Sequence, residues 1–132
     1  MNVKRFLLAL VGVFVFVFAY SFLVHGTLLK GLYESTMHLW RPESDHNMLF
    51  GIGSMLAFSA VMTYFYSCYS KEDKGINGGV CYGLFAGLLL GSVSLGTYCY
   101  MPIPLELTLS WVVSDIVQGV GSGVVLSFLY KG

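Results

Sequence analysis

The sequence predicts an all-helical membrane protein, in which four transmembrane helices form a compact bundle and one integral membrane domain spans residues 1–132. Composition is the first reason: 56% of the 132 residues are hydrophobic, 11% are charged, and the mean hydropathy is +0.74. A soluble domain carries about 25% charged residues. The second reason is a set of four stretches with almost no charge, each close to the roughly 20 residues that cross a bilayer. The formal net charge is zero, so we expect no nucleic-acid partner.

The first stretch, residues 6–24, follows Lys4 and Arg5 and contains no charged residue. A secretory signal peptide has a shorter apolar region, of about 7–15 residues, followed by a small-residue cleavage site. This run instead ends in Phe22-Leu-Val-His25-Gly, which offers no such site. We therefore expect a retained transmembrane helix.

Residues 27–40 have the pattern of an amphipathic helix. Apolar residues recur at three- and four-residue spacing, while Lys30, Glu34 and His38 follow one another at intervals of four on the other face. The segment ends with Trp40, whose indole is favoured at the membrane interface, and Pro42 then stops a helix. We predict a short interfacial helix between the first two spans.

Three further spans are predicted at residues 48–66, 79–100 and 105–130. The first of these contains small residues suited to helix contacts, namely Gly51, Gly53, Ala57 and Ala60. A charged, water-soluble linker over residues 70–79 precedes the next span. Pro102 and Pro104 predict a tight, non-helical turn before the last span.

The span over residues 79–100 carries glycines at strict intervals of four, a pattern typical of a glycine zipper. They are Gly79, Gly83, Gly87 and Gly91. At about 100° per residue, this spacing places all four on one side of a helix. Small residues let two helix backbones approach closely in a bilayer, and this close packing drives their association. We therefore expect the glycine face to pack on Gly119 and Gly123 of the last span.

Asp115 is the one ionisable side chain that falls deep within a predicted span. An ionised carboxylate there costs at least about 2.5–3.5 kcal/mol on insertion scales, so we expect it to face the interior of the bundle. Gln118 and Ser122 share its helix face, and Ser114 adjoins it. Two interpretations are open. One is a proton or cation path through this polar cluster, and the other is a structural hydrogen bond to a Tyr, Ser or Thr across the glycine interface.

Three histidines, His25, His38 and His46, are expected on the outer surface as candidate metal ligands. Imidazole with thioether or thiol groups suits copper, and imidazole with carboxylates suits zinc. None of their spacings matches a recognised motif, so we expect no cofactor, with copper, zinc or haem as the alternatives.

Cys68, Cys81 and Cys99 lack Cys-x-x-Cys spacing, and we expect them to be small buried apolar residues.

Motifs of catalysis are not found in the sequence. It contains no Gly-rich phosphate loop, nucleophile elbow or His-Glu-x-x-His. The loops are also too short for a soluble catalytic domain. We therefore expect a protein that is not an enzyme.

The distribution of basic residues predicts an orientation with both termini in the cytoplasm. This orientation places five basic residues inside and two outside, in agreement with the positive-inside bias. The inner set is Lys4, Arg5, Lys71, Lys74 and Lys131, and the outer set is Lys30 and Arg41.

The chain resembles a group of small bacterial four-span membrane proteins catalogued as domains of unknown function. The resemblance rests on the aromatic end of the first span (Ala19-Tyr20-Ser-Phe), on Leu39-Trp40, on the Gly79-to-Gly91 repeat and on Trp111 through Gly123. It implies location in a bacterial inner membrane and assigns no functional residues. The polar segment from His25 to His46 departs from the pattern of that group.

Two functions follow as hypotheses. One is a homo-oligomeric channel or transporter for an ion or small solute, with Asp115 and Gln118 lining the path. The other is a non-catalytic accessory or scaffold subunit of a larger membrane complex, including one that handles redox chemistry or metals. Both give the chain the lipid bilayer and a protein partner, either another copy of itself or a different membrane protein.

Overall fold

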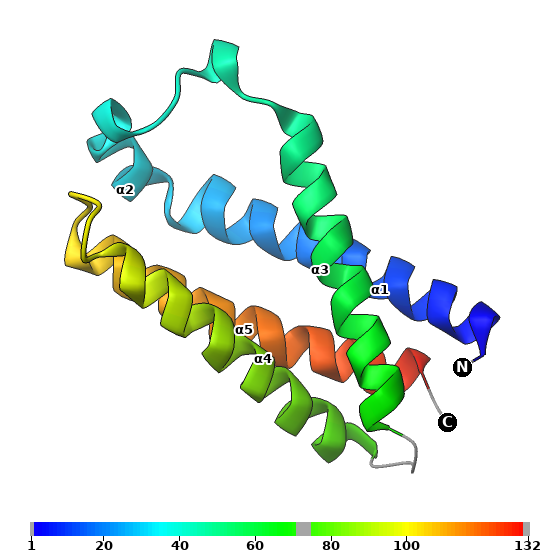
Figure 1. Ribbon diagram of the computed structural model, residues 1–132. Helices are drawn as coiled ribbons and strands as arrows, with labels where there is room; N and C mark the ends of the chain where they lie inside the picture. Colours follow the sequence, from blue (N-terminus) through cyan, green and yellow to red (C-terminus); the bar gives the residue numbers. More distant parts are fainter. Residues whose placement is uncertain (1, 71–74, 131–132) are drawn as a thin grey trace.

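The computed structural model describes residues 2–70 and 75–130, and all regular secondary structure in these ranges is helical. Four long helices dominate (Figure 1). They are α1 (Val3–Leu23), α3 (Met48–Tyr69), α4 (Gly75–Thr97) and α5 (Leu105–Leu129). A π-helical turn, Val24–Leu28, extends α1, and the short helix α2 (Lys30–Ser35) and two 3₁₀ turns (Met37–Leu39 and Glu43–Asp45) lead to α3.

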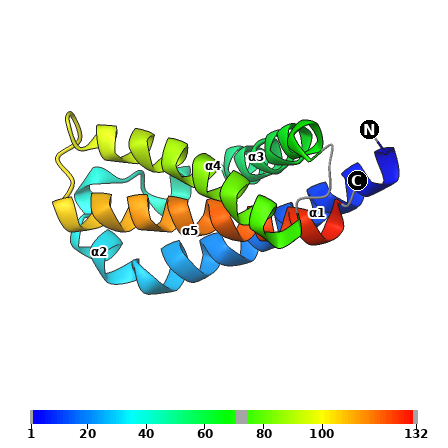
Figure 2. The same cartoon turned by 90° about the horizontal axis from the view of Figure 1, so that it is seen from below.

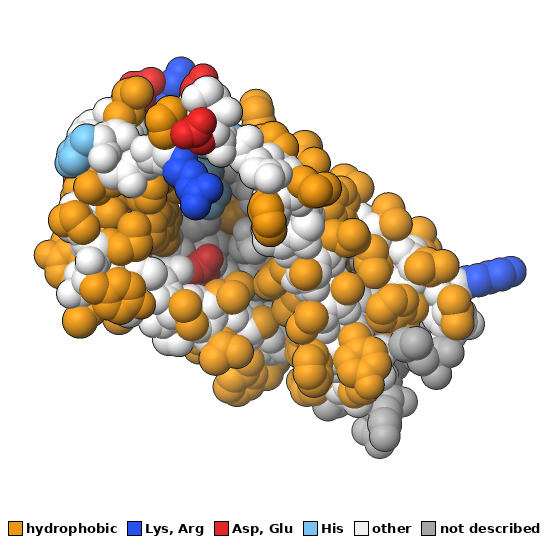
Figure 3. Space-filling view, turned by 45° about the horizontal axis from the view of Figure 1, so that its top comes forward, with side chains coloured by type: hydrophobic (Ala, Val, Ile, Leu, Met, Phe, Trp, Pro, Cys, Tyr) orange, Lys and Arg blue, Asp and Glu red, His pale blue; other side chains and the backbone are white. Residues whose placement is uncertain are grey.

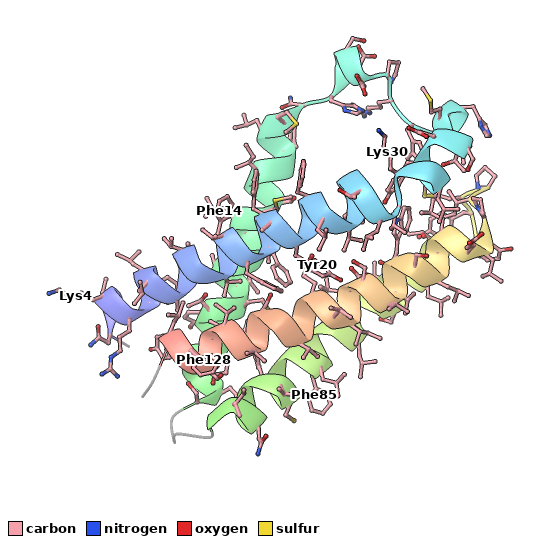
Figure 4. The ribbon with its side chains drawn as sticks, turned by 180° about the vertical axis from the view of Figure 1, so that it is seen from behind. Lys4, Phe14, Tyr20, Lys30, Phe85 and Phe128 are labelled. Carbon is pink, nitrogen blue, oxygen red and sulfur yellow. The ribbon has the colours of Figure 1, made fainter. Side chains whose placement is uncertain are left out.

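Four of the described helices are long and apolar enough to cross a membrane, in agreement with the predicted four spans. The first of these segments is Val3–Leu28, because the π turn continues α1 without a break. His25 therefore lies near the end of a membrane-length segment. Figure 4 shows Lys4 and Lys30 at opposite ends of this segment.

Helix α5 is the centre of the fold. Its main neighbour is α4, and the chain turns at Pro102 and Pro104 between the two helices, so that they run antiparallel. Helix α1 packs on another side of α5 (Figure 2). Tyr20 joins α1 to α5, because its hydroxyl donates a 3.0 Å hydrogen bond to the carbonyl oxygen of Ser114 (Figure 4). Helix α3 crosses α1 and has few contacts with α5.

The contact between α4 and α5 is made backbone to backbone. All four glycines of the 79–91 stripe are buried against α5, and Gly119 and Gly123 are buried on the facing side. A Cβ atom on Gly119 would lie 2.6 Å from the backbone nitrogen of Gly87, so no larger residue fits there without moving the helices apart. At this contact the lack of a side chain sets the distance between the helices.

The buried apolar cluster of the protein lies toward the end of the bundle that holds both chain ends. It joins α1, α3 and the end of α5. Its members are Ala9, Val13, Val17, Met62, Tyr66, Leu126 and Tyr130. Helix α4 is tied to the same region by the hydroxyl of Tyr82, which donates a 2.8 Å hydrogen bond to the carbonyl oxygen of Met62.

At the opposite end of the bundle, α3 diverges from the other helices (Figure 1). Its first residues, Met48, Leu49 and Phe50, are between 68% and 77% exposed. The sequence suggested Gly51 and Gly53 as helix contacts, yet a Cβ atom added to either glycine would meet no described atom within 4 Å. This divergence opens the space in which the candidate site lies.

Three expectations need correction. The single helix expected over residues 27–40 is divided into a π turn, the six-residue α2 and a 3₁₀ turn. Helix α4 begins at Gly75, inside the expected linker, where a φ of +57° suits glycine. Cys68, Cys81 and Cys99 are all exposed instead of buried. Lys71, Lys74 and Lys131, used for the orientation, lie outside the described residues.

Candidate functional site

A cavity of about 820 Å³ lies between the four long helices at the end where α3 diverges. Each helix contributes to its wall, and His46 adds a side chain from the segment before α3. The polar lining residues are Ser21, His25, His46, Ser54, Asp115 and Gln118. The apolar lining residues include Val17, Phe18, Phe22, Met48, Met55, Phe58 and Leu90. Figure 3 shows a hollow in this face, with acidic atoms at its floor and basic atoms over its rim.

Asp115 is the one acidic residue of this lining. At 1.5 Å per residue it lies about 15 Å along α5 from Leu105, well inside the length of a span. The hydroxyl of Ser94 on α4 donates a 2.5 Å hydrogen bond to its Oδ2 atom. Its Oδ1 atom accepts no hydrogen bond from the residues that the structure describes. The carboxyl group is thus anchored on one side and open to the cavity.

The structure brings together only part of the polar cluster expected on α5. Gln118 lines the same cavity as Asp115. Ser114 is buried on the side that meets Tyr20 and lines a different, smaller pocket. Ser122 is completely buried, lies outside the cavity lining, and its hydroxyl makes no hydrogen bond with the described residues.

Above Asp115, a chain of hydrogen bonds connects α5, α2 and the π turn. Trp111 Nε1 donates to Tyr33 Oη over 2.7 Å, and Tyr33 Oη lies 2.7 Å from His25 Nδ1. Indole is a donor only, so the Tyr33 oxygen accepts from Trp111, and we assign the tyrosine proton to the bond with His25. His25 then carries its own proton on Nε2. His25 faces the cavity within electrostatic range of Asp115.

Tyr33 lies outside the membrane-length segments, and partial burial raises the pKa of its phenol above the ordinary value, while the hydrogen bond from Trp111 acts in the opposite direction. The phenol therefore stays protonated at neutral pH and remains a donor. Rings pack around it: Trp40 lies 5.7 Å from Tyr33 and 6.0 Å from Trp111 between ring centroids. This aromatic cluster fixes α2 against α5.

A second cavity, of about 650 Å³, lies under the 25–46 segment and adjoins the first. His25, Gly26 and His46 line both cavities. Its charged residues balance, with Lys30 and Arg41 against Glu34 and Glu43. The two cavities together lead from the segment between α1 and α3 down to Asp115.

In the other direction the cavity ends on packed side chains. Val17, Met55 and Phe58 line it and also belong to, or pack against, the buried apolar cluster. That cluster fills the space between α1, α3 and α5 toward the chain ends. The cavity is therefore open toward one end of the helices and closed toward the other.

The three histidines do not come together as a ligand set. His25 and His46 line the cavity, whereas His38 is exposed and outside it. Across residues 2–70 and 75–130, no group of three or more His, Cys, Asp or Glu side chains is placed to hold a metal ion. The described structure thus separates His38 from His25 and His46, and metal binding by these histidines stays a prediction.

Sequence reasoning missed Ser94 and Tyr33 as individual site residues. Ser94 follows the glycine stripe by three residues, so it reaches the α5 interface where the backbones are closest. Its position in the sequence could have identified Ser94, because a Tyr, Ser or Thr hydroxyl was expected to bond Asp115 across the glycine interface. Tyr33 gave no signal, because it fits an ordinary apolar stripe and its partner Trp111 is 78 residues away.

No protein-family model, curated protein or solved structure matches this chain.

Proposed function

We propose that this protein is a small membrane transporter in which Asp115 binds and releases a proton through the cavity that reaches it from one membrane face. The observation that carries the proposal is the cavity, which holds one carboxylate at its floor, opens at one end and is closed by apolar packing at the other. An open channel would need a continuous path. A closed end is instead what alternating exposure of a binding site to the two faces requires.

The proton is the ion that this lining supports best. An alkali or divalent cation that leaves water needs several oxygen ligands at once. Around Asp115 the described residues supply one carboxylate, the Gln118 amide and a few hydroxyls. A proton needs only the carboxylate. The structural and functional interpretations of Asp115 are therefore compatible, because Asp115 lines the cavity while its Oδ2 atom accepts the bond from Ser94.

The proposal includes both termini in the cytoplasm of a bacterial cell. The described ends of α1 and α5 lie at the same end of the bundle, and the basic residues of the sequence favour placing that end inside. The cavity would then open outward.

Self-association is also part of the proposal, since the exposed first half of α3 leaves room for a second copy, although one chain holds all the residues of the site.

Proton flux into liposomes tests the proposal. The purified protein is reconstituted with a trapped pH-sensitive dye, and a potassium diffusion potential, negative inside, drives protons inward. We expect flux above that of protein-free liposomes for the wild type. Asp115→Asn should remove this flux, because the amide keeps an oxygen for Ser94 but carries no titratable proton.

Glu106→Gln is the matched control, since Glu106 is the other carboxylate of α5 and lies in its first turn, outside the cavity. It should leave the flux unchanged. Flux that does not depend on Asp115, or wild-type flux no greater than that of empty liposomes, would overturn the proposal.

A second candidate function is that of an accessory subunit docked to a larger membrane protein. The first residues of α3, Met48 to Phe50, favour it, because these three large apolar side chains are between 68% and 77% exposed. Gentle detergent purification and a mass measurement separate the two functions. A defined foreign subunit would support the accessory role, and a particle made only of this chain would support the transporter.

A further inference from the structure

We infer that the cavity binds a hydrophobic organic cation, with its charge at Asp115 and its apolar groups against the aromatic and thioether walls. This inference rests on the proposed function and names the class of solute that would be carried.

The size fits a small organic molecule. Sites for such ligands measure about 300–1,000 Å³, and this cavity measures about 820 Å³. An inorganic ion would leave most of that space to water. The wall is mainly apolar, so a ligand that fills it must itself be largely hydrophobic.

The chemistry of the wall favours a cation. Phe18, Phe22 and Phe58 face the cavity from α1 and α3. The faces of aromatic rings attract cations that are weakly hydrated. Met48 and Met55 add flexible, polarisable side chains that adapt to ligands of different shape.

The charge balance points the same way. Asp115 is the one acidic residue in the cavity lining, which includes no Lys or Arg side chain. Basic side chains stay in the adjoining cavity, where Lys30 pairs with Glu34 at 3.8 Å. An anion would meet an uncompensated carboxylate, whereas a monovalent cation would neutralise it.

Two of the apolar side chains that line the cavity are also largely exposed. Phe22 is 71% exposed and Met48 is 68% exposed, although both line the cavity. These side chains, one from α1 and one from α3, would offer accessible apolar surface to a hydrophobic cation.

Equilibrium binding of radiolabelled tetraphenylphosphonium to the full-length protein in detergent tests the inference. We expect saturable binding, weakened about thirtyfold or more by Asp115→Asn, as for the loss of a buried charge partner. Phe18→Leu should weaken it about two- to tenfold, because it keeps apolar area but removes the ring.

Two controls match these variants. Glu106→Gln should bind the probe like the wild type. Tetraphenylborate has the same shape and the opposite charge, and it should show no binding that depends on Asp115. Equal binding of the phosphonium cation by the wild type and Asp115→Asn, or binding of the borate at the same site, would overturn the inference. A thermal melt of each variant excludes unfolding as the cause of a loss.

The outcomes separate this inference from the proposed function. Proton flux that depends on Asp115 without phosphonium binding would retain the transporter and overturn the solute class. Phosphonium binding that depends on Asp115 without proton flux would retain the ligand and overturn proton transport. If neither proton flux nor phosphonium binding depends on Asp115, the proposed function and this inference are both wrong.

Discussion

Asp115 accepts one short hydrogen bond from α4, the helix whose glycines pack against the backbone of α5. The bond from Ser94 crosses from α4 to α5 just beyond the last buried glycine of the stripe. The arrangement places an acidic group inside a span while leaving one of its oxygens to the cavity. Its stability contribution and its functional role can be measured separately.

A double-mutant cycle with Ser94→Ala and Asp115→Asn gives the strength of this bond. We expect a coupling of about 0.6 kcal/mol, seldom above about 1.7 kcal/mol, as for other hydrogen bonds between membrane helices. Ser94→Ala should lower thermal stability slightly and retain part of the proton flux. A coupling near zero would show that the two side chains do not interact in the folded protein. Ser92→Ala is the control, because Ser92 is exposed and bonds only within α4.

Tyr33 is the second residue on which the outer part of the site depends. Tyr33→Phe removes the acceptor of Trp111 and the partner of His25, so we expect a loss of about 1 kcal/mol of unfolding free energy at neutral pH. The tyrosine pKa is raised in the folded state, so its contribution is complete below the ordinary value of about 10. The contribution is lost as the pH rises through the raised value.

Tyrosinate absorbance measures this shift. The difference between the alkaline titrations of the wild type and Tyr33→Phe should show one phenol that ionises above its ordinary range. A difference titration centred at or below the ordinary value would contradict the buried, hydrogen-bonded placement of Tyr33.

At the scale of the elements, the glycine contact between α4 and α5 gives a sharp comparison. A Cβ on Gly87 would lie 2.6 Å from the Cα of Ile116, whereas a Cβ on Gly96 meets nothing within 4 Å. Gly87→Ala should therefore lower the melting temperature in detergent, because backbone must move. Gly96→Ala should leave it unchanged or raise it slightly, since Ala is the better helix former. Equal melting temperatures for the two variants would show that the helices are not in contact at Gly87.

Hydropathy and glycine spacing were enough to predict the four long helices, because in a bilayer the backbone must satisfy its own hydrogen bonds and long apolar runs must be helical. The 27–40 segment was harder to predict. Its apolar stripe has helical spacing, yet contacts of Tyr33 and Trp40 with Trp111 hold the backbone in short turns. Such contacts are tertiary, and local periodicity does not record them.

At the scale of the whole molecule, the cavity is the feature that the sequence did not predict. It depends on the divergence of α3 from α1 and α5, and nothing in the residue pattern of α3 distinguishes its packed half from its exposed half. Asp115 and Gln118 could be identified because an ionisable group within a span is rare. The position of His25 could not be predicted, because the continuation of α1 through a π turn has no simple sequence signal.

One-sided access to the floor of the cavity is the central claim, and thiol labelling tests it most directly. Cys68, Cys81 and Cys99 are exposed and can first be replaced by Ser. Gln118→Cys and Ser122→Cys are then compared in vesicles, with a membrane-impermeant maleimide applied to each face in turn. These positions lie one turn apart on α5, and only Gln118 lines the cavity. We predict that Gln118→Cys is labelled from the face where the segment between α1 and α3 lies, and that Ser122→Cys is labelled from neither face. Labelling of both positions, of neither, or of Gln118→Cys from the face of the chain ends would contradict the account.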